Sequence, residues 1–416
     1  MKPNKSFGAL RSLLLSMMLG AATFAHGAQA EALSPRLTEP RLAPVAPGQG
    51  NEAQRTWLAK RTDANVYKTY ARNLDLAQAV EPFLNFALKG SGLPPREREI
   101  VILRMGWLCQ AEYEWAHHAR IGKRAGLTGA DVHRIAAGPE AEGWSDFDRV
   151  LLRMVDELRY DAMVSEATWR ALRARYSDAQ AIDAVATAGQ YQFISMFLNS
   201  LGVQLDSGIP DLVDRLPRDV AAPEPATRPA SPRLTRPRLE PVAAPAMTPE
   251  QRDLVQAQLQ KGVLPNFDAT LLNHQKLYGP YKTADGYIQH AVLLPPKTRE
   301  ILLLRTAWNT RDAYGWAHHV GPAKAAGLTD VDVARVAAGP SASGWNEDQL
   351  ALLRAADELQ REAFISDATW RTLAKYYDSK QLVDIVNVVG NFAINGQIAN
   401  TLGVQVEAGY PAMPKG

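Results

Sequence analysis

The chain has 416 residues, of which 46% are hydrophobic and 22% are charged. This composition is typical of globular protein, and the length is enough for more than one domain with a core of its own, so disorder throughout is excluded. The 46 basic and 44 acidic residues nearly balance. We therefore expect neither nucleic acid nor an anionic membrane surface as a partner. With the single cysteine Cys109, the chain can form no internal disulfide bond.

Residues 1–30 have the features of a secretory signal peptide. They combine a basic start, an apolar run from Leu13 to Phe24 and the small-x-small sequence Ala28-Gln-Ala30, which together are typical of a cleaved leader. The apolar run is shorter than the roughly 20 residues that a membrane span needs. We predict a periplasmic or secreted protein that has no membrane contact once the leader is removed.

One segment, from Pro95 to His118, is written a second time from Pro296 to His319. From 93 to 210 and from 294 to 411 the two copies align without a gap, at a constant offset of 201 positions. A unit that occurs only twice indicates tandem duplication, because solenoids need more and shorter repeats. The polar and aromatic residues shared by the two segments are Arg98/Arg299, Glu99/Glu300, Arg104/Arg305, Trp107/Trp308, Tyr113/Tyr314, Trp115/Trp316, His117/His318 and His118/His319.

A similar Pro-rich arm precedes each copy, at 34–45 and at 231–242. Such proline density disfavours helix and packed strand, so we expect both arms to be extended and the second to serve as an interdomain linker. Their arginines are expected to promote solubility rather than to bind a ligand. The predicted parts are a signal peptide at 1–30, a Pro-rich arm at 31–50, a first domain at 51–210, a Pro/Ala-rich linker at 211–249 and a second domain at 250–411.

Apolar residues recur at helical spacing in both copies, and no stretch alternates with period two, which predicts two tandem all-α domains. Pro94 and Pro95 suit the first turn of a helix that ends near Leu108, and a second helix is expected from Glu112 to Gly126. The other expected helices begin near Thr128, Ser145 and Ser165, and a long one runs from Asp178 to Leu201.

On a helix, Glu114 lies one turn before both His117 and His118. A carboxylate that orients an imidazole is a common arrangement for a general base near neutral pH. Glu99 joins this group if the two helices pack antiparallel. The alternative is that His117 points to solvent and that the Glu–His spacing is an ordinary helical pair. Because Glu99 and both histidines recur in the second copy while surrounding surface positions changed, the functional interpretation stays open beside the structural one.

The Glu-x-x-His-His pattern also resembles half of a metal site. The second copy has Gly315 where the first has Glu114, and no other His-rich motif supplies a third ligand. We therefore predict no metal and no cofactor. Cys109 ends an apolar helix and is replaced by Thr310 in the second copy, so we interpret it as a buried small residue rather than a reactive thiol.

Trp115 and Trp316 lie within the polar clusters, so we expect them to line substrate pockets. Arg104 and Arg305 are expected to hold a substrate carboxylate. The alternative for each arginine is a structural ion pair with the glutamate that lies five positions before it. The remaining tryptophans shared by the two copies are interpreted as core residues.

The string Arg-Glu-Arg-Glu-Ile-Val-Ile-Leu-Arg-x-x-Trp, then Ala-Glu-Tyr-Glu-Trp-x-x-His, then Ala125-Gly-Leu-Thr128 and Gly143-Trp144, resembles the carboxymuconolactone decarboxylase family. That family belongs to the all-helical superfamily shared with alkylhydroperoxidase D. The resemblance covers about 65–206 and 266–407. It implies compact helical units that assemble as trimers or hexamers, so we expect a homo-oligomer, with a trimer of two-domain chains as one arrangement.

The resemblance implies different chemistry in its two branches. The peroxidase branch uses Cys-x-x-Cys, but Ala111 and Glu114 stand at those positions, so thiol peroxidase activity is not expected. The decarboxylase branch acts on a carboxylated lactone. It implies His118 as acid/base, Glu114 as its orienter, Glu99 as a second acid/base, Tyr113 as hydrogen-bond donor and Arg104 as carboxylate holder. The candidate catalytic set is completed by His117 and by Glu300, Tyr314, His318 and His319 of the second copy.

These observations predict an exported enzyme that performs Glu/His acid–base chemistry, a decarboxylation or related proton transfer, on a small organic acid or lactone. The alternatives are a non-catalytic oligomeric binding protein and a redox or metal-dependent variant of the peroxidase branch. The second copy is expected to be weaker or only structural, because it has Gly315 for Glu114 and Pro322 inside a helix.

Overall fold

The computed structural model describes residues 36–46, 48–208, 215–217, 219–221 and 231–414. All of them belong to one compact unit, Ser34–Gly416. The predicted signal peptide lies outside the described residues, as does most of the predicted linker before residue 231. Within the described residues every regular element is a helix and no strand occurs. The prediction of an all-α chain with two tandem domains is confirmed.

The helices of the first domain begin and end close to the predicted residues. The chain breaks between the two predicted helices at Gln110, which has φ 50°, and α4 and α5 pack against each other on either side of it. Ser145, Ser165 and Ser177 cap the starts of the last three helices with their side chains. The helices are α1 (Glu52–Leu58), α2 (Asn65–Tyr70), α3 (Leu74–Asn85) with a π-helical turn at Phe86–Gly90, α4 (Pro95–Leu108), α5 (Glu112–Arg124), α6 (Gly129–Ala137), α7 (Asp146–Asp161), α8 (Glu166–Arg173) and α9 (Asp178–Leu201).

The second domain repeats this order. Both bounds of α7 and α9 recur in α17 and α19 after 201 positions. Pro322 lies inside α15 without ending that helix. The helices are α10 (Pro249–Leu254), α11 (Gln256–Gln260), α12 (Asn266–Leu271), α13 (Gln275–His290), α14 (Pro296–Thr310), α15 (Ala313–Ala325), α16 (Asp330–Ala338), α17 (Glu347–Glu362), α18 (Asp367–Leu373) and α19 (Ser379–Leu402), with 3-10 turns at Ala244–Ala246, Leu272–His274 and Gly339–Ser341.

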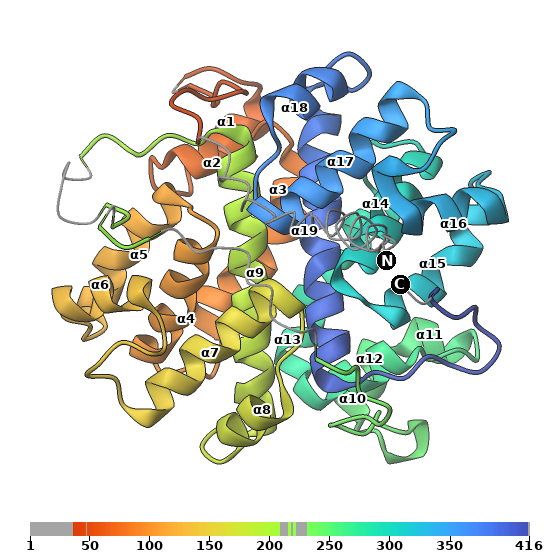
Figure 1. Ribbon diagram of the computed structural model, residues 1–416, viewed down its shortest axis with the longest axis horizontal. Coiled ribbons are helices and arrows are strands. Elements are labelled where there is room, and N and C mark those ends of the chain that lie inside the picture. The colour runs from red at the N-terminus through yellow and green to blue at the C-terminus, as the bar shows by residue number, and fades with distance from the viewer. Residues whose placement is uncertain (1–35, 47, 209–214, 218, 222–230, 415–416) are drawn as a thin grey trace, which may run out of the picture. The chain divides into compact units, whose positions relative to one another are not determined.

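The two long helices α9 and α19 lie side by side between the two domains (Figure 1). Nearly all their side chains are buried, so each helix is covered on every face by the rest of the protein. Each domain supplies part of that cover to the other domain's long helix. Among the described residues α19 is the only helix long and apolar enough to cross a membrane, but 94% of its apolar window is buried inside the protein. Its composition is therefore explained by the core.

Two equivalent glycines allow this close contact. A Cβ atom on Gly189 of α9 would lie 2.5 Å from Oε1 of Gln397 on α19. A Cβ atom on Gly390 of α19 would overlap the ring of Phe193 on α9. The helices approach at these positions because glycine carries no side chain.

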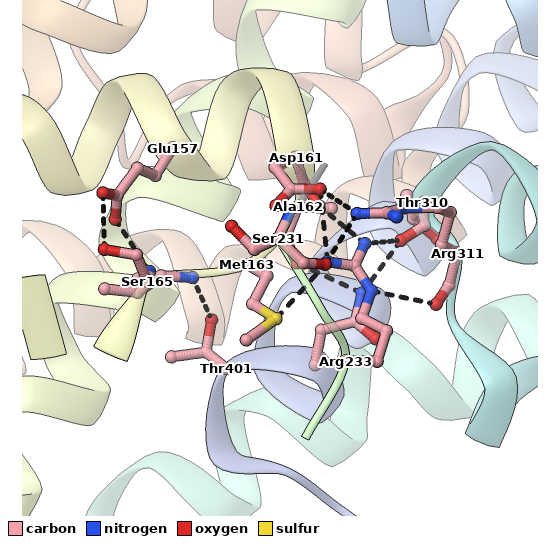
Figure 2. A network of polar contacts seen from close by, with 12 residues as sticks. Glu157, Asp161, Ala162, Met163, Ser165, Ser231, Arg233, Thr310, Arg311 and Thr401 are labelled. Atoms are coloured by element: carbon pink, nitrogen blue, oxygen red, sulfur yellow. Dashed lines mark hydrogen bonds and ion pairs between the residues drawn. The ribbon is translucent and has the colours of Figure 1, made fainter. Parts of the chain in front are cut away.

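The Pro-rich arm before the second domain ties the two domains together (Figure 2). Nη2 of Arg233 donates to the backbone oxygen of Asp161 in the first domain at 2.7 Å and to that of Thr310 in the second at 2.9 Å. Arg311 also contacts the Asp161 carboxylate. The prediction that the arm arginines mainly promote solubility is wrong for Arg233, because its guanidinium satisfies carbonyl groups of both domains.

The first arm makes the equivalent connection on the other side. Nη2 of Arg36 donates to the backbone oxygens of Cys109 at 3.1 Å and Glu362 at 2.7 Å, which belong to different domains. Burial lowers the pKa of Arg36 to about 10, so the guanidinium stays charged at neutral pH. In their described residues, 36–46 and 231–243, both arms are free of helix and strand, and they act as straps across the junction.

Buried polar groups at the junction differ between the two halves. Asp183 lies 2.6 Å from Nε2 of His274. At the equivalent place Asp384 accepts hydrogen bonds from Asn73 at 3.0 Å and Tyr287 at 2.9 Å. Burial raises the pKa of Asp384 to about 6. An aspartate is therefore buried at the equivalent place in both halves, but its partner is an imidazole at Asp183 and an amide and a phenol at Asp384.

The strap interpretation predicts a stability loss for Arg233→Ala. We expect the free energy of unfolding to fall by about 1–3 kcal/mol, because part-buried carbonyl groups lose a charged donor. Urea denaturation followed by circular dichroism measures the change. The control is Arg236→Ala, which removes an exposed arginine of the same arm. Equal stability of the two variants would contradict the strap role.

Candidate active site

A cavity of about 210 Å³ lies in the first domain, among helices α2, α3, α5 and α9. Its wall combines aromatic and acidic groups with aliphatic side chains. Such a mixture of an apolar surface and a few polar groups is typical of small-molecule sites. The polar and aromatic residues that line it include Tyr67, Tyr70, Glu81, Tyr113, Glu114, His117, His118 and Tyr191.

The imidazole of His118 is held between two carboxylates. Its Nδ1 lies 2.6 Å from Oε2 of Glu99, and its Nε2 lies 2.9 Å from Oε1 of Glu114. Glu114 precedes His118 by one turn of α5, whereas Glu99 reaches it from the antiparallel α4. Glu99 is fully buried, and its other oxygen lies 3.0 Å from Arg98. The predicted group of Glu99, Glu114 and His118 therefore exists, with Glu114 and His118 at the cavity wall and Glu99 behind them.

The two carboxylates determine the charge of His118. Burial by itself would lower the pKa of the imidazole, but the charges of Glu114 and Glu99 outweigh that effect and raise the pKa to about 10. At neutral pH the group is therefore an imidazolium paired with two carboxylates. In this state both ring nitrogens carry protons, so the group supplies a proton rather than accepting one.

Tyr113 and His117 form a second group with an unpredicted residue, Asp206. The Asp206 carboxylate accepts from the Tyr113 hydroxyl at 2.9 Å and from the backbone N–H of Asn65 at 2.7 Å, and it lies 3.1 Å from Nε2 of His117. Although burial opposes it, these donors lower the pKa of Asp206. The group fixes the segment after α9 to α2 and α5. The same arrangement recurs with Tyr314, His318, Glu407 and Asn266.

Sequence reasoning missed Asp206, although a signal for it existed. An acidic residue stands four positions after the helix-ending glycine in both copies, as Asp206 after Gly202 and as Glu407 after Gly403. Because Tyr113 donates to Asp206, its hydroxyl is engaged within the protein. The predicted role of Tyr113 as a donor to substrate is therefore not what this geometry favours.

The opposite wall of the cavity carries Glu81, which was also not predicted. Its carboxylate is bound by Arg61, with Nε at 2.9 Å, and the guanidinium lies over the ring of Trp57. Glu81 also lines an open groove beside the cavity. Glu81 and the tyrosines Tyr67 and Tyr70 come from α2 and α3, far from the repeated motif, so local spacing could not indicate them.

Four predicted substrate-binding residues lie elsewhere. Arg104 makes a bidentate ion pair with Asp156, at 2.7 and 3.1 Å, and its Nη1 donates to two backbone carbonyls. Its partner is thus neither a substrate nor the predicted Glu99. Trp115 is 1% exposed and packs edge-on against Trp107 in the core. Arg305 with Asp357 and Trp316 with Trp308 repeat these contacts in the second domain.

The second domain keeps only part of the arrangement around its histidine. Nδ1 of His319 lies 2.9 Å from Oε2 of Glu300. Gly315 supplies no carboxylate for Nε2. The nearby Asp312 caps α15 by accepting from the Gly315 N–H at 2.9 Å, and it also accepts from Asn395 at 3.2 Å. Burial raises the pKa of Asp312. The carboxylate–imidazole–carboxylate series is therefore absent around His319 among the described residues.

Ion pairs occupy the second domain where the first has cavity-lining side chains. The positions of Tyr67, Glu81 and Leu84 are taken by Asp268, Lys282 and Asp285. Nζ of Lys282 lies 3.3 Å from Asp268 and 2.6 Å from Asp285. These bonds join three side chains whose counterparts stand apart around the cavity of the first domain. This difference agrees with the predicted divergence of the second copy.

The described residues show no group of three or more His, Cys, Asp or Glu side chains placed to hold a metal ion. Cys109 is fully buried, and burial raises the pKa of its thiol. It therefore lies away from the cavity as a neutral thiol.

Comparison with known proteins identifies the type of domain. Residues 75–151 and 275–358 match the carboxymuconolactone decarboxylase family. Among solved structures, the chain is similar to an alkylhydroperoxidase AhpD core, an uncharacterized peroxidase-related protein from Ralstonia eutropha JMP134, with 20% identity, a TM-score of 0.35, and coverage of 38% of this chain and 88% of that one. It is also similar to the debrominase Bmp8 in complex with 2,3,4-tribromopyrrole, with 15% identity, a TM-score of 0.35 and coverage of 42% and 94%. No curated protein matches the chain.

The raised pKa of His118 predicts that this imidazole titrates near pH 10. Its contribution to stability is complete below its unfolded pKa of 6.5 and is lost as the pH rises through about 10. Nitrogen-15 NMR of the labelled histidines measures the titration. Glu114→Gln should lower this pKa because it removes a neighbouring charge. Glu140→Gln, at an exposed residue of the same domain, should not. A wild-type midpoint near 6.5 would contradict this charge assignment.

Proposed function

Because the chain carries two tandem domains of the carboxymuconolactone decarboxylase family, we propose that it is an exported enzyme that transfers protons on a small lactone or related organic compound. The reaction takes place in the cavity of the first domain. The observation that carries the proposal is the pairing of Glu114 with His118 at the wall of that cavity, backed by the buried Glu99.

Glu114 acts as the base that meets the substrate. Its carboxylate lines the cavity and is oriented by His118 at 2.9 Å. It removes a proton from a carbon atom next to a carbonyl group, and the electron pair left on that carbon moves to the carbonyl oxygen as an enolate. When a carbon–carbon double bond lies next to that carbon, the anion is a dienolate, and the proton on Glu114 then returns to its far (γ) carbon while the double bond moves into conjugation with the carbonyl group. Atoms and electrons balance as an isomerisation without a co-reactant.

His118 supplies the positive charge that this step requires. An imidazolium beside the cavity stabilises the negative charge that develops on the enolate. Glu99 is a positioning residue, since it contacts Nδ1 of His118 and does not line the cavity. Its contact with Nδ1 keeps the ring oriented so that Nε2 faces Glu114.

Decarboxylation is the related reaction that the family name suggests, and the geometry favours it less. It requires a group that holds the departing carboxylate, and Arg104 was expected to do this. Arg104 is instead paired with Asp156, and no lysine or arginine is found among the described residues that line the cavity. Proton transfer on a substrate that keeps its carbon skeleton fits these residues better.

Proton exchange with solvent tests the proposal whatever the final product is. In D₂O, NMR measures the uptake of deuterium into a panel of small lactones and ketones. We expect the wild-type protein to accelerate the uptake for at least one of them. His118→Gln should reduce that rate by about 100-fold or more, the usual effect of removing one group that stabilises the negative charge of a transition state.

The second domain provides the matched control. His319→Gln changes the equivalent histidine, which lacks the second carboxylate, and it should leave the rate nearly unchanged. Thermal unfolding of both variants shows whether either has lost its fold. If the two folded variants lose equal activity, the site is not confined to the first domain. If no compound of the panel exchanges faster with the wild type, the enzyme proposal fails.

Export is part of the proposal and rests on the sequence alone. The basic start, the apolar run and Ala28-Gln-Ala30 support cleavage after Ala30. We expect protein produced in a Gram-negative host and recovered from the periplasm to begin at Glu31, as mass spectrometry of the intact chain would show. Leu14→Arg, which places a charge in the apolar run, should block removal of the leader. Recovery of uncleaved full-length protein from the wild-type sequence would contradict export.

A further inference from the structure

A hydroxyl group without a protein partner lies at the cavity wall. Tyr70 lines the cavity and is 3% exposed, and its hydroxyl oxygen has no hydrogen-bond partner among the described residues. Its ring stacks on Phe197, with centroids 4.0 Å apart and planes at 10°, which fixes its position. Buried hydroxyls are nearly always hydrogen-bonded, so this group is a free donor for a ligand, or for a water molecule that a ligand displaces.

The hydroxyl can only be a neutral group in this place. Burial raises the pKa of Tyr70 well above its ordinary range, and the charge of Glu114 raises it further. Tyr70 therefore keeps its proton, and its hydroxyl can donate a hydrogen bond to an acceptor. A phenol that donates to an oxygen beside Glu114 would also stabilise negative charge on that oxygen.

The glutamates at the cavity are paired with positively charged side chains of the protein. Glu81 is paired with Arg61 and Glu114 with His118, while Glu99 behind them is paired with Arg98. No lysine or arginine belongs to the described lining. A free carboxylate would lose its hydration and would find only the His118 imidazolium, which is already paired with two carboxylates, so its burial is costly. A cationic ligand would find both lining carboxylates already neutralised, so neither sign of charge is favoured.

We propose that the cavity binds an uncharged compound with a carbonyl oxygen, and that the Tyr70 hydroxyl donates a hydrogen bond to this oxygen. The inference rests on the proposed function for the location of the site, and it names the substrate class. In this arrangement the carbonyl group of the ligand lies at Tyr70, and Glu114 removes the proton from the neighbouring C–H bond. Tyr70 is thereby a substrate-binding residue that stabilises the enolate.

The second domain lacks this chemistry. Leu271 stands at the position of Tyr70, and Lys282 stands at the position of Glu81. The phenol donor is therefore confined to the first domain, and Lys282 at the equivalent place is paired with Asp268 and Asp285. One binding site per chain is expected.

Binding of a matched pair of lactones tests the proposal. The probes are methyl 5-oxotetrahydrofuran-2-carboxylate, which is uncharged, and the corresponding free acid, which is ionised at pH 7. Calorimetry and ligand-observed NMR measure both affinities on the full mature chain. We expect the ester to bind at least about tenfold more tightly than the acid, because only the acid brings an unpaired charge into the cavity.

Tyr70→Phe isolates the hydrogen bond. It should weaken ester binding about 3- to 10-fold, the effect of one lost neutral hydrogen bond. It should not lower the melting temperature, because the lost hydroxyl has no partner in the free protein. The control Tyr160→Phe changes a tyrosine outside this cavity and should leave the affinity unchanged.

Each of the remaining outcomes refutes one part of the proposal. Acid binding as tight as ester binding, or no ester binding at millimolar concentration, refutes the uncharged ligand class. An unchanged ester affinity in Tyr70→Phe refutes the role of Tyr70. If the ester binds as expected but no compound exchanges protons in D₂O, the ligand class stands and the proposed catalysis is wrong.

Discussion

The contact between α9 and α19 is the constraint on which the rest of the structure depends. Each of these helices is buried along nearly its whole length, so neither domain can cover its own long helix alone. Duplication supplies the missing cover from a second copy, and the glycines Gly189 and Gly390 let the two helices approach. The arms then cross the junction and satisfy carbonyl groups of both domains through Arg36 and Arg233. The two domains thus form one compact unit.

The contact between α9 and α19 also positions the cavity of the first domain. Tyr191 and Ile194 reach the cavity from α9, the helix that packs on the other domain. The ring of Tyr191 meets His118 edge-on, with centroids 4.9 Å apart. A shift of α9 at the junction would therefore move a wall of the cavity. This coupling gives the second domain a physical role even where its own histidine lacks a complete set of partners, because it holds the long helix of the first domain in place.

The two sites diverged through a few side chains on a common backbone. Replacing Glu114 by Gly315 removes one carboxylate from the imidazole, and replacing Tyr67, Glu81 and Leu84 by Asp268, Lys282 and Asp285 creates internal ion pairs. Buried charges are tolerated when they are paired. The ion-paired side chains of the second domain could therefore replace the cavity-lining side chains of the first without a change of fold. The junction diverged in the same way, with His274 opposite Asp183 and Asn73 opposite Asp384.

The sequence by itself determined the helical class, the duplication, the bounds of α4, α5 and α9, and the grouping of Glu114 with His118. These depend on local periodicity, on capping residues and on side chains one helical turn apart. Only the tertiary structure decided that Glu99 contacts the second nitrogen of His118. It also decided that Arg104 pairs with Asp156 and that Trp115 packs in the core. Finally, it placed Tyr70 and Glu81 at the cavity wall and Asp206 against Tyr113. Those contacts join helices far apart in the chain, and the direction in which a long side chain points is set by what packs around it.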